Sequence, residues 1–145
     1  MFYASPEIYA SPEILFGPNV LLVDGHEDSL WVATVALEQM NCNVLPVKTA
    51  KQAVRVLRHF EPDIFISELR LPEEDGYELM RQVKAYLNSQ KRQISAIALT
   101  TQVSSEAKAK ALAAGFCRYL AKPYQIDTLG EMVAQLTPAH AQVLN

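Results

Sequence analysis

Four polar side chains in this sequence stand directly after short apolar runs, where strands of a buried sheet would end. Asp24 follows "NVLLV", Glu68 follows "DIFIS", Thr100 closes "ISAIALT", and Lys122 follows "CRYLA". The carboxyl ends of parallel strands meet at one rim of a sheet, and such sheets carry their functional groups there. We therefore expect two carboxylates, a hydroxyl and an ammonium to meet in one polar site, with Glu68 at its centre.

The sequence lacks the residue patterns that enzymatic catalysis or metal binding by cysteines would require. No Gly-rich phosphate loop follows the first apolar run and no nucleophile with a neighbouring base is evident, so an independent enzyme is disfavoured. Cys42 and Cys117 are far apart and have no second Cys or His at metal-ligand spacing, which favours reduced, packed thiols. An ion pair between Glu68 and Lys122 that only compensates a buried charge is the plain structural alternative to a functional site.

The site requires a scaffold of alternating strands and helices. Pro46 lacks an N–H group and assigns the second strand to a sheet edge, and Gly115 suits the C-cap of the fourth helix. Residues 73–75, "EED", are expected to form a solvated turn. Several strands are apolar throughout, which predicts an α/β fold with a doubly wound, five-stranded parallel sheet in a three-layer sandwich. Strands are expected at 19–24, 43–47, 63–67, 94–100 and 117–121, and helices at 27–41, 50–60, 76–88, 104–114 and 125–136.

Length and composition limit the classes of function. The chain has 145 residues, 50% hydrophobic and 20% charged, which is enough for one domain with a sizeable core. The net charge is -3 and Lys and Arg are not concentrated, so protein partners are expected and nucleic acid is not. No run approaches the ~20 apolar residues of a membrane span. The first eighteen residues hold three prolines and no basic residue, unlike a signal peptide. We expect a soluble, cytoplasmic protein without membrane contact.

The chain is expected to divide into an arm, one domain and a tail. The N-terminal arm, residues 1–18, carries "YASPEI" at 3–8 and again at 9–14. Two copies of six residues are too few for a solenoid, so the repeat belongs to an arm that is either inert or lies along a domain. The domain is expected at residues 19–137 and the tail at residues 138–145.

Residues 19–137 resemble the receiver domain of two-component response regulators, which has a flavodoxin-like fold. The sequence is especially similar to receivers attached to hybrid sensor kinases. The resemblance is carried by "VLLVDGHEDS", "PDIFISELRLPEEDGYEL", "IALT" and "YLAKP". In that family an Asp at the end of the third strand takes a phosphoryl group from a kinase histidine. A pair of acids after the first strand helps to hold Mg²⁺, Thr and Lys contact the phosphoryl oxygens, and an aromatic residue on the fifth strand responds.

Most positions of the site agree with the family. The resemblance gives Asp24 the role of an acidic-pocket residue, Thr100 and Lys122 the phosphoryl-contact positions, and Tyr119 the role of the responding aromatic. It also implies a cis peptide bond between Lys122 and Pro123.

The two departures concern the phosphorylation chemistry. Glu68 occupies the phosphoacceptor position, and Gly25 replaces the second acid of the pair. Glu carries its carboxylate one methylene farther from the backbone, and a displacement of ~1 Å costs roughly a hundredfold in rate. Gly25 removes an oxygen from a cation site that needs near-octahedral geometry. We expect weak or absent Mg²⁺ binding, a vestigial metal site at Asp24 and Glu68, and no cofactor.

These departures favour a phosphorylation-independent, non-enzymatic interaction module. An extended Glu68 reaches toward Lys122 and Thr100 and imitates a phosphoryl group in part, with one negative charge against ~1.5 to 2. Three alternatives stay open: a structural relic, a receiver that still accepts a phosphoryl group from a histidine kinase, and an engineered phosphomimetic, against which Gly25 counts. The expected partner is a sensor histidine kinase or a downstream signalling protein, bound through the face formed by residues 104–136. A homodimer and membership of a longer hybrid kinase are left open.

Overall fold

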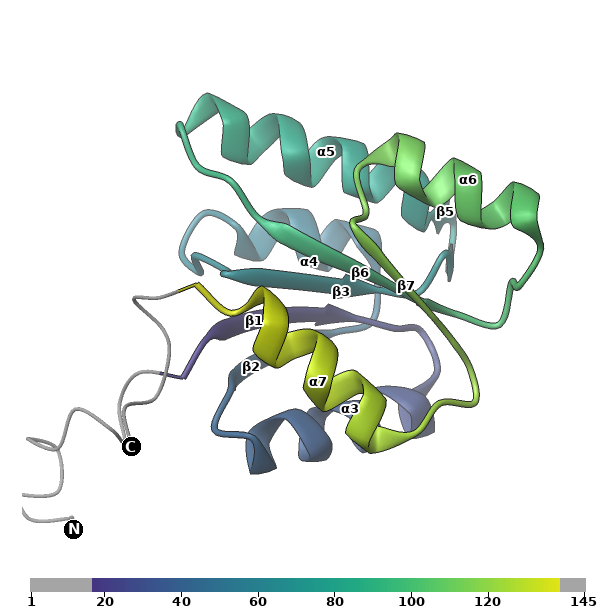
Figure 1. Ribbon diagram of the computed structural model, residues 1–145. Helices are drawn as coiled ribbons and strands as arrows, with labels where there is room; N and C mark the ends of the chain where they lie inside the picture. Colours follow the sequence, from purple (N-terminus) through teal and green to yellow (C-terminus); the bar gives the residue numbers. More distant parts are fainter. Residues whose placement is uncertain (1–16, 139–145) are drawn as a thin grey trace, which may run out of the picture.

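A five-stranded parallel sheet forms the centre of the protein (Figure 1). The computed structural model describes residues 17–138, so most of the expected N-terminal arm and tail lie outside the described residues. The strand order is β2-β1-β3-β6-β7, and every neighbouring pair is parallel. Strand β2 lies on one side of β1, and the later strands β3, β6 and β7 follow on the other side. This reversal of strand order at β1 confirms the predicted doubly wound α/β fold. The strands are β1 (Asn19–Val23), β2 (Asn43–Val47), β3 (Ile64–Ser67), β6 (Ser95–Thr100) and β7 (Arg118–Ala121).

Helices cover both faces of this sheet. Helices α4 (Ala50–Val56), α5 (Gly76–Ser89) and α6 (Ser105–Ala114) lie on one face, and α3 (Glu27–Gln39) and α7 (Ile126–Leu136) lie on the other (Figure 1). The result is the expected three-layer sandwich. Within the part of the chain that the structure describes, no helix combines the length and apolar character needed to cross a membrane.

Side chains alternate between two hydrophobic cores along each strand. In β1, Leu21 and Val23 belong to the core beneath α4, α5 and α6, whereas Val20 and Leu22 belong to the core with α3 and α7. All four are almost completely buried. Burial on both faces explains why the strand is apolar throughout, and it supplies most of the free energy that holds the sheet together.

The register of the strands places their carboxyl ends next to one another at one rim of the sheet. Val23 of β1 pairs with Ser67 of β3, so Asp24 and Glu68 leave neighbouring strands side by side. The N–H of Lys122 donates to the carbonyl at the end of β6 over 2.8 Å, which brings the start of the loop after β7 to the same rim. The carboxyl ends of four strands therefore surround one small region.

The largest difference from the expected helix boundaries is at the end of α4, and the other helices agree within two residues. Helix α4 ends at Val56 and not at residue 60. The chain tightens there, because the N–H of Arg58 donates to the carbonyl of Arg55 over 3.5 Å and the N–H of His59 donates to that of Val56 over 3.1 Å. Such short-range bonds are common where a helix ends.

The expectation of a solvated turn at residues 73–75 is wrong for Glu74 and Asp75. Strands β4 (Arg70–Leu71) and β5 (Glu74–Asp75) pair as an antiparallel hairpin. Asp75 also caps α5, since its Oδ1 accepts a hydrogen bond from the N–H of Glu78 at 2.7 Å. The hairpin follows Glu68 directly and therefore forms one wall of the site.

Three other expectations can be compared with the fold. Pro46 lies in β2 at the edge of the sheet, as predicted. Gly115 ends α6 with a φ of 126°, a conformation that favours glycine. Cys42 is buried, but Cys117 is exposed, so the expectation of packed thiols is wrong for Cys117. That residue immediately precedes the edge strand β7, where helices cover the chain less completely.

Candidate functional site

Asp24 lies directly after β1 and is 1% exposed. Its Oδ1 accepts a hydrogen bond from the N–H of His26 at 3.0 Å, and its Oδ2 accepts from the hydroxyl of Ser29 and the ammonium of Lys122, both at 2.6 Å. Burial by itself would raise the pKa of Asp24. The hydrogen bonds from Lys122, Ser29 and the His26 backbone outweigh burial and hold this pKa below its usual value. Asp24 is therefore an ionised carboxylate whose oxygens are already bonded.

Glu68 follows β3 and is 3% exposed. Its Oε2 accepts a hydrogen bond from the N–H of Leu69 at 2.6 Å and lies 3.4 Å from the N of Arg70. Its Oε1 lies 3.3 Å from Nζ of Lys122. The additional methylene of Glu thus lets one carboxylate contact both the backbone after β3 and the ammonium, and these contacts compensate its burial.

Lys122 connects the two acids. It follows β7, its side chain is 12% exposed, and its peptide bond to Pro123 is cis, as the resemblance to receiver domains implies. The ammonium lies between Asp24 and Glu68 and forms ion pairs with both. This is the geometry of a buried three-member charge cluster with one net negative charge.

Thr100, at a phosphoryl-contact position, and Tyr119, the aromatic residue of β7, lie near this charge cluster, but among the described residues their side chains form no hydrogen bond with it. The hydroxyl of Thr100 accepts a hydrogen bond from the N–H of Gln102 at 3.1 Å, and among the described residues no hydrogen bond joins it to Glu68. Tyr119 of β7 packs against the core beneath α6, and its buried hydroxyl has no partner among the described residues. Burial raises the pKa of Tyr119, and the neighbouring Tyr77 and Glu68 add to this effect. Its hydroxyl therefore points into the protein.

The hairpin fills the space beside Gly25. A Cβ on Gly25 would lie 2.9 Å from Cδ of Pro72, which occupies the turn between β4 and β5. The hairpin thus closes over the position where the resemblance places a second acid. Sequence spacing does not reveal this contact, because the two residues meet only in the folded chain.

Gly76 is a positioning residue that sequence reasoning missed. It begins α5, and its N–H donates to the carbonyl of Leu69 over 2.8 Å. A Cβ at this position would lie 2.4 Å from the carbonyl oxygen of Glu68, a separation that no real contact permits. Only glycine lets α5 approach the loop that carries Glu68. The single detectable sign was a glycine directly before the helical pattern.

The outer side of the site is an open cleft of about 490 Å³. Ser29 of α3, which was not selected from the sequence, contributes its hydroxyl to Asp24. Glu27 lies at the cleft, where its exposed carboxylate forms an ion pair with Lys48. The cleft is lined by His26, Glu27, Asp28, Ser29, Glu68, Thr101 and Lys122.

Comparison with known proteins assigns this arrangement to a family. A family model described as response regulator receiver domain matches residues 20–134, which is most of the chain. The chain belongs to the response regulator receiver domain family. An uncharacterized 14.6 kDa protein of Leptolyngbya boryana, from the sodA1 3' region, is 32% identical to this receiver domain over 116 residues, covering 80% of the chain and 87% of that protein.

Other relatives of this receiver domain are much longer proteins. Hybrid signal transduction histidine kinase D of Dictyostelium discoideum is 34% identical over 87 residues, which are 59% of this chain and only 6% of the kinase. Sensory/regulatory protein RpfC of Xanthomonas campestris pv. campestris is 27% identical over 124 residues, which are 86% of this chain and 17% of that protein. These likenesses place the chain in two-component signalling.

Solved receiver structures share the fold. The receiver domain of sensor histidine kinase PA1611 from Pseudomonas aeruginosa PAO1, with a magnesium ion coordinated in its active site cleft, has a TM-score of 0.74 at 29% identity. The match covers 83% of this chain and 97% of that domain. A two-component response regulator from Clostridium difficile reaches a TM-score of 0.76 at 19% identity, over 82% and 94% of the two chains, and supports the fold alone.

The residues present in this receiver domain do not fit a divalent cation as they stand. Oδ2 of Asp24 and Oε1 of Glu68 both contact the ammonium of Lys122, and Gly25 offers no side-chain oxygen. Among the described residues, no group of three or more His, Cys, Asp or Glu side chains is arranged to hold a metal ion. A divalent ion would have to displace the lysine before it gained two carboxylate ligands.

Proposed function

We propose that this receiver domain is a non-enzymatic signalling module that works through protein contacts and does not depend on phosphorylation. The observation that carries the proposal is the position of the Lys122 ammonium, 2.6 Å from Asp24 and 3.3 Å from Glu68. A cation that belongs to the chain neutralises carboxylates that would otherwise attract a metal ion. The ammonium then compensates one of the two buried negative charges without Mg²⁺ and without a phosphoryl group.

Glu68 supplies part of what a phosphoryl group would supply. One oxygen accepts from the backbone after β3 and the other faces Lys122, with one negative charge in place of ~1.5 to 2. A fixed charge of this kind biases a two-state element without completing the change. The inward hydroxyl of Tyr119 supports such a bias, whereas the missing bond to Thr100 limits it.

The proposed partner surface is the face formed by residues 104–136, which comprises α6, β7 and α7. Leu112 and Ile126 are about half exposed on this face, at 50% and 51%, and Val103 beside it is 67% exposed. These side chains belong to elements on either side of the edge strand β7, and a partner that covers this edge would bury them. We assign this face to a sensor histidine kinase or to a downstream signalling protein, in keeping with the kinase relatives.

Intact mass spectrometry tests whether the site accepts a phosphoryl group. The protein is incubated with a small phosphodonor and Mg²⁺ beside a receiver domain that has the usual phosphoacceptor Asp and acid pair. We expect the control to gain the mass of one phosphoryl group and this protein to keep its mass, because Glu68 is already bonded on both oxygens. A phosphorylated product would contradict the proposal and support the alternative, a receiver that accepts a phosphoryl group from a histidine kinase.

Calorimetric titration with Mg²⁺ gives a second and independent test. We expect no saturable binding at physiological concentrations, since the ammonium of Lys122 already contacts the two carboxylates. Saturable binding to the unchanged protein would show that the lysine gives way to the metal ion, and the site would then be an ordinary cation site.

A further inference from the structure

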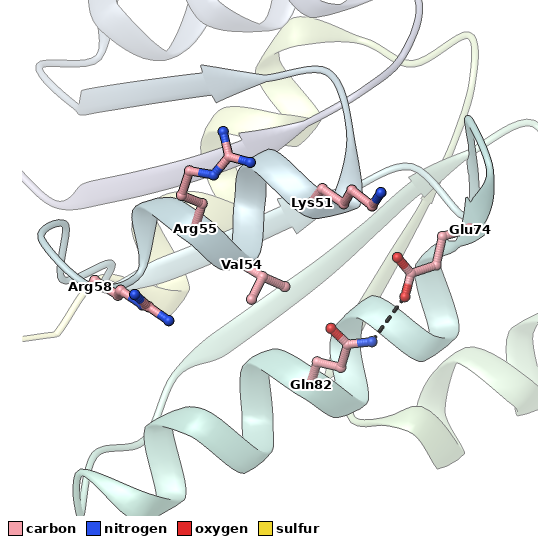
Figure 2. Close-up of a pocket in the computed structure, with 6 residues that line it drawn as sticks. All are labelled: Lys51, Val54, Arg55, Arg58, Glu74 and Gln82. Atoms are coloured by element: carbon pink, nitrogen blue, oxygen red, sulfur yellow. Dashed lines mark hydrogen bonds between the residues drawn. The ribbon is translucent and has the colours of Figure 1, made fainter.

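A cleft between α4 and α5 gathers three cationic side chains and shares no residue with the cleft beside Glu68. Its volume of about 340 Å³ is at the lower end of the range for ligand pockets. Figure 2 shows the cationic side chains spread along α4 and the turn after it, with Val54 between them facing α5. The cleft is lined by Lys51, Val54 and Arg55 of α4, by Arg58 in the turn that follows this helix, and by Glu74 and Gln82 on the opposite wall.

The cations of this cleft are unpaired among the described residues. Among the described residues, the lysines and arginines that form ion pairs are Lys48, Arg81, Arg92 and Lys122, and none of them lines this cleft. Glu74, the acid on the opposite wall, accepts a hydrogen bond from Nε2 of Gln82 at 2.9 Å (Figure 2). The cleft therefore contains positive charge that the described residues leave uncompensated.

This arrangement is unfavourable for α4 by itself. Lys51 and Arg55 are four residues apart, so like charges lie next to one another on the surface of α4, and Arg58 adds a third in the turn after the helix. Arg55 in the last turn suits the helix dipole, but Lys51 in the first turn opposes it, and that turn contains no acid. The stability of α4 accounts for the presence of Arg55 near its end. It does not account for the grouping of Lys51, Arg55 and Arg58.

We propose that this cleft binds an extended acidic segment of a protein partner. The cations are spread from Lys51 to Arg58, over α4 and the turn that follows it, and their ends point apart in Figure 2. They cannot converge on one phosphate, but they suit carboxylates spaced along a chain, with which arginine pairs in bidentate fashion. Val54, which is 38% exposed, offers an apolar contact between the acids.

The opposite wall argues against a nucleic acid as the occupant. Glu74 would face a phosphate backbone across the cleft and repel it, and the net charge of -3 gives no general attraction for such a polyanion. A short acidic peptide segment can place an amide or hydroxyl group beside Glu74 and Gln82 instead. The ligand class is therefore a carboxylate-rich peptide with interspersed apolar residues.

Fluorescence anisotropy with a labelled peptide tests the proposal. The probe is a peptide of about ten residues in which Glu alternates with Leu, long enough to span the cleft when extended. Lys51→Gln with Arg58→Gln should weaken binding about fivefold or more, because two rim charges are lost. The matched control, Lys91→Gln with Arg81→Gln, removes one exposed lysine and one exposed arginine that lie outside the cleft and outside the face formed by residues 104–136. It should change binding by less than about twofold.

Four outcomes would overturn the proposal. The parent protein does not bind the peptide, or the two double variants weaken binding equally, which would indicate general charge attraction. A single-stranded oligonucleotide of the same charge binds as tightly as the peptide and responds to the cleft variant, which would indicate a nucleic-acid surface. Lastly, Glu7→Gln with Glu13→Gln tightens peptide binding several-fold, which would make the N-terminal segment of the chain itself the occupant.

Discussion

The ammonium of Lys122 is shared unequally between its two carboxylates, at 2.6 Å from Asp24 and 3.3 Å from Glu68. Asp24 receives two further hydrogen bonds, from Ser29 and the His26 backbone. Glu68 receives a short one from the backbone after β3, which would remain after loss of its charge. The three members of the cluster therefore contribute differently to the stability of the fold.

We predict a rank order of destabilisation for three substitutions in this cluster. Lys122→Met leaves two buried carboxylates without a counter-charge and should cost the most, on the order of 3–5 kcal/mol. Asp24→Asn should cost less, and Glu68→Gln the least, about 1–2 kcal/mol, because Lys122 keeps Asp24 as a partner. Urea unfolding measures all three. A Glu68→Gln variant less stable than Asp24→Asn would contradict the order.

Removal of the lysine charge should also create a divalent-cation site. Lys122→Gln leaves the carboxylates of Asp24 and Glu68 close together and without an ion pair, and two adjacent carboxylates attract Mg²⁺. We expect Mg²⁺ to raise the melting temperature of this variant and not that of the parent. The double variant Lys122→Gln with Glu68→Gln is the control and should lose the effect. Equal responses of parent and variant would show that Lys122 does not occupy the cation position.

The lowered pKa of Asp24 predicts a loss of stability in acid. Hydrogen bonds lower its pKa in the folded state below the ordinary value of 3.8, so the unfolded state binds the proton first. The stabilisation is complete above about pH 4 and disappears as the pH falls through the folded pKa. Urea unfolding between pH 5 and about pH 2.5 should show a steeper loss for the parent than for Asp24→Asn. Parallel curves would mean that Asp24 does not contribute.

Single residues of the site differed in how well the sequence predicted them. Asp24, Glu68 and Lys122 each follow an apolar run, and parallel strands put such residues together at one rim. Ser29, Pro72 and Gly76 act through contacts that depend on how a helix or hairpin folds back on the strand ends. No local pattern in the sequence records those contacts, and the sequence therefore did not identify them.

At the scale of elements, the approach of α5 to the loop after β3 depends on Gly76. Gly76→Ala would place a methyl group against the carbonyl of Glu68, so the helix or the loop must move. We expect a loss of roughly 1–3 kcal/mol, typical of overpacking against rigid atoms, measured by chemical unfolding.

Gly130→Ala is the matched control for this prediction. A Cβ at Gly130 would lie 2.7 Å from Sδ of Met40, the far end of a flexible side chain that can shift. Alanine also favours the interior of α7 by roughly 1 kcal/mol over glycine. This variant should be neutral or more stable. If both variants lose the same stability, the contact with Glu68 is not the cause.

Helix α6 should be less protected than α5, which lies on the same face of the sheet. Its buried residues are Ala107, Ala111 and Ala114, whose small side chains bury little apolar area, whereas α5 buries larger ones such as Leu79 and Met80. In native-state hydrogen exchange we expect the amides of α6 to exchange before those of α5. Slower exchange in α6 would require a source of stabilisation other than packing on the sheet.

Long elements were easier to predict than short ones. The helix at 76–88 was predicted from the alignment of Leu79, Val83 and Leu87, and α5 ends only one residue later. The hairpin β4–β5 was missed because strands of two residues have no detectable alternation. It forms because the chain must reverse between Glu68 and the start of α5, a demand set by the tertiary fold.

At the scale of the whole molecule, repeated alternation of apolar strands and helices was sufficient to predict the fold class. The lack of an N–H group on Pro46 correctly placed β2 at an edge. The sequence contains no local pattern for the positions of β3, β6 and β7 within the sheet. Their order follows from packing α4, α5 and α6 together over one face and α3 and α7 over the other.

The pair formed by Lys122 and Asp24 joins residues 98 positions apart in the chain. During synthesis from the N-terminus, the ribosome releases Asp24 and Glu68 well before Lys122. Until the last strand arrives, the strand ends hold two carboxylates with no counter-charge, and burying them is costly. The ion pair between Lys122 and Asp24 therefore forms only after the chain has been synthesised through residue 122. A nascent or truncated chain that stops before β7 lacks this ion pair, and its exposed acids distinguish it from the finished protein.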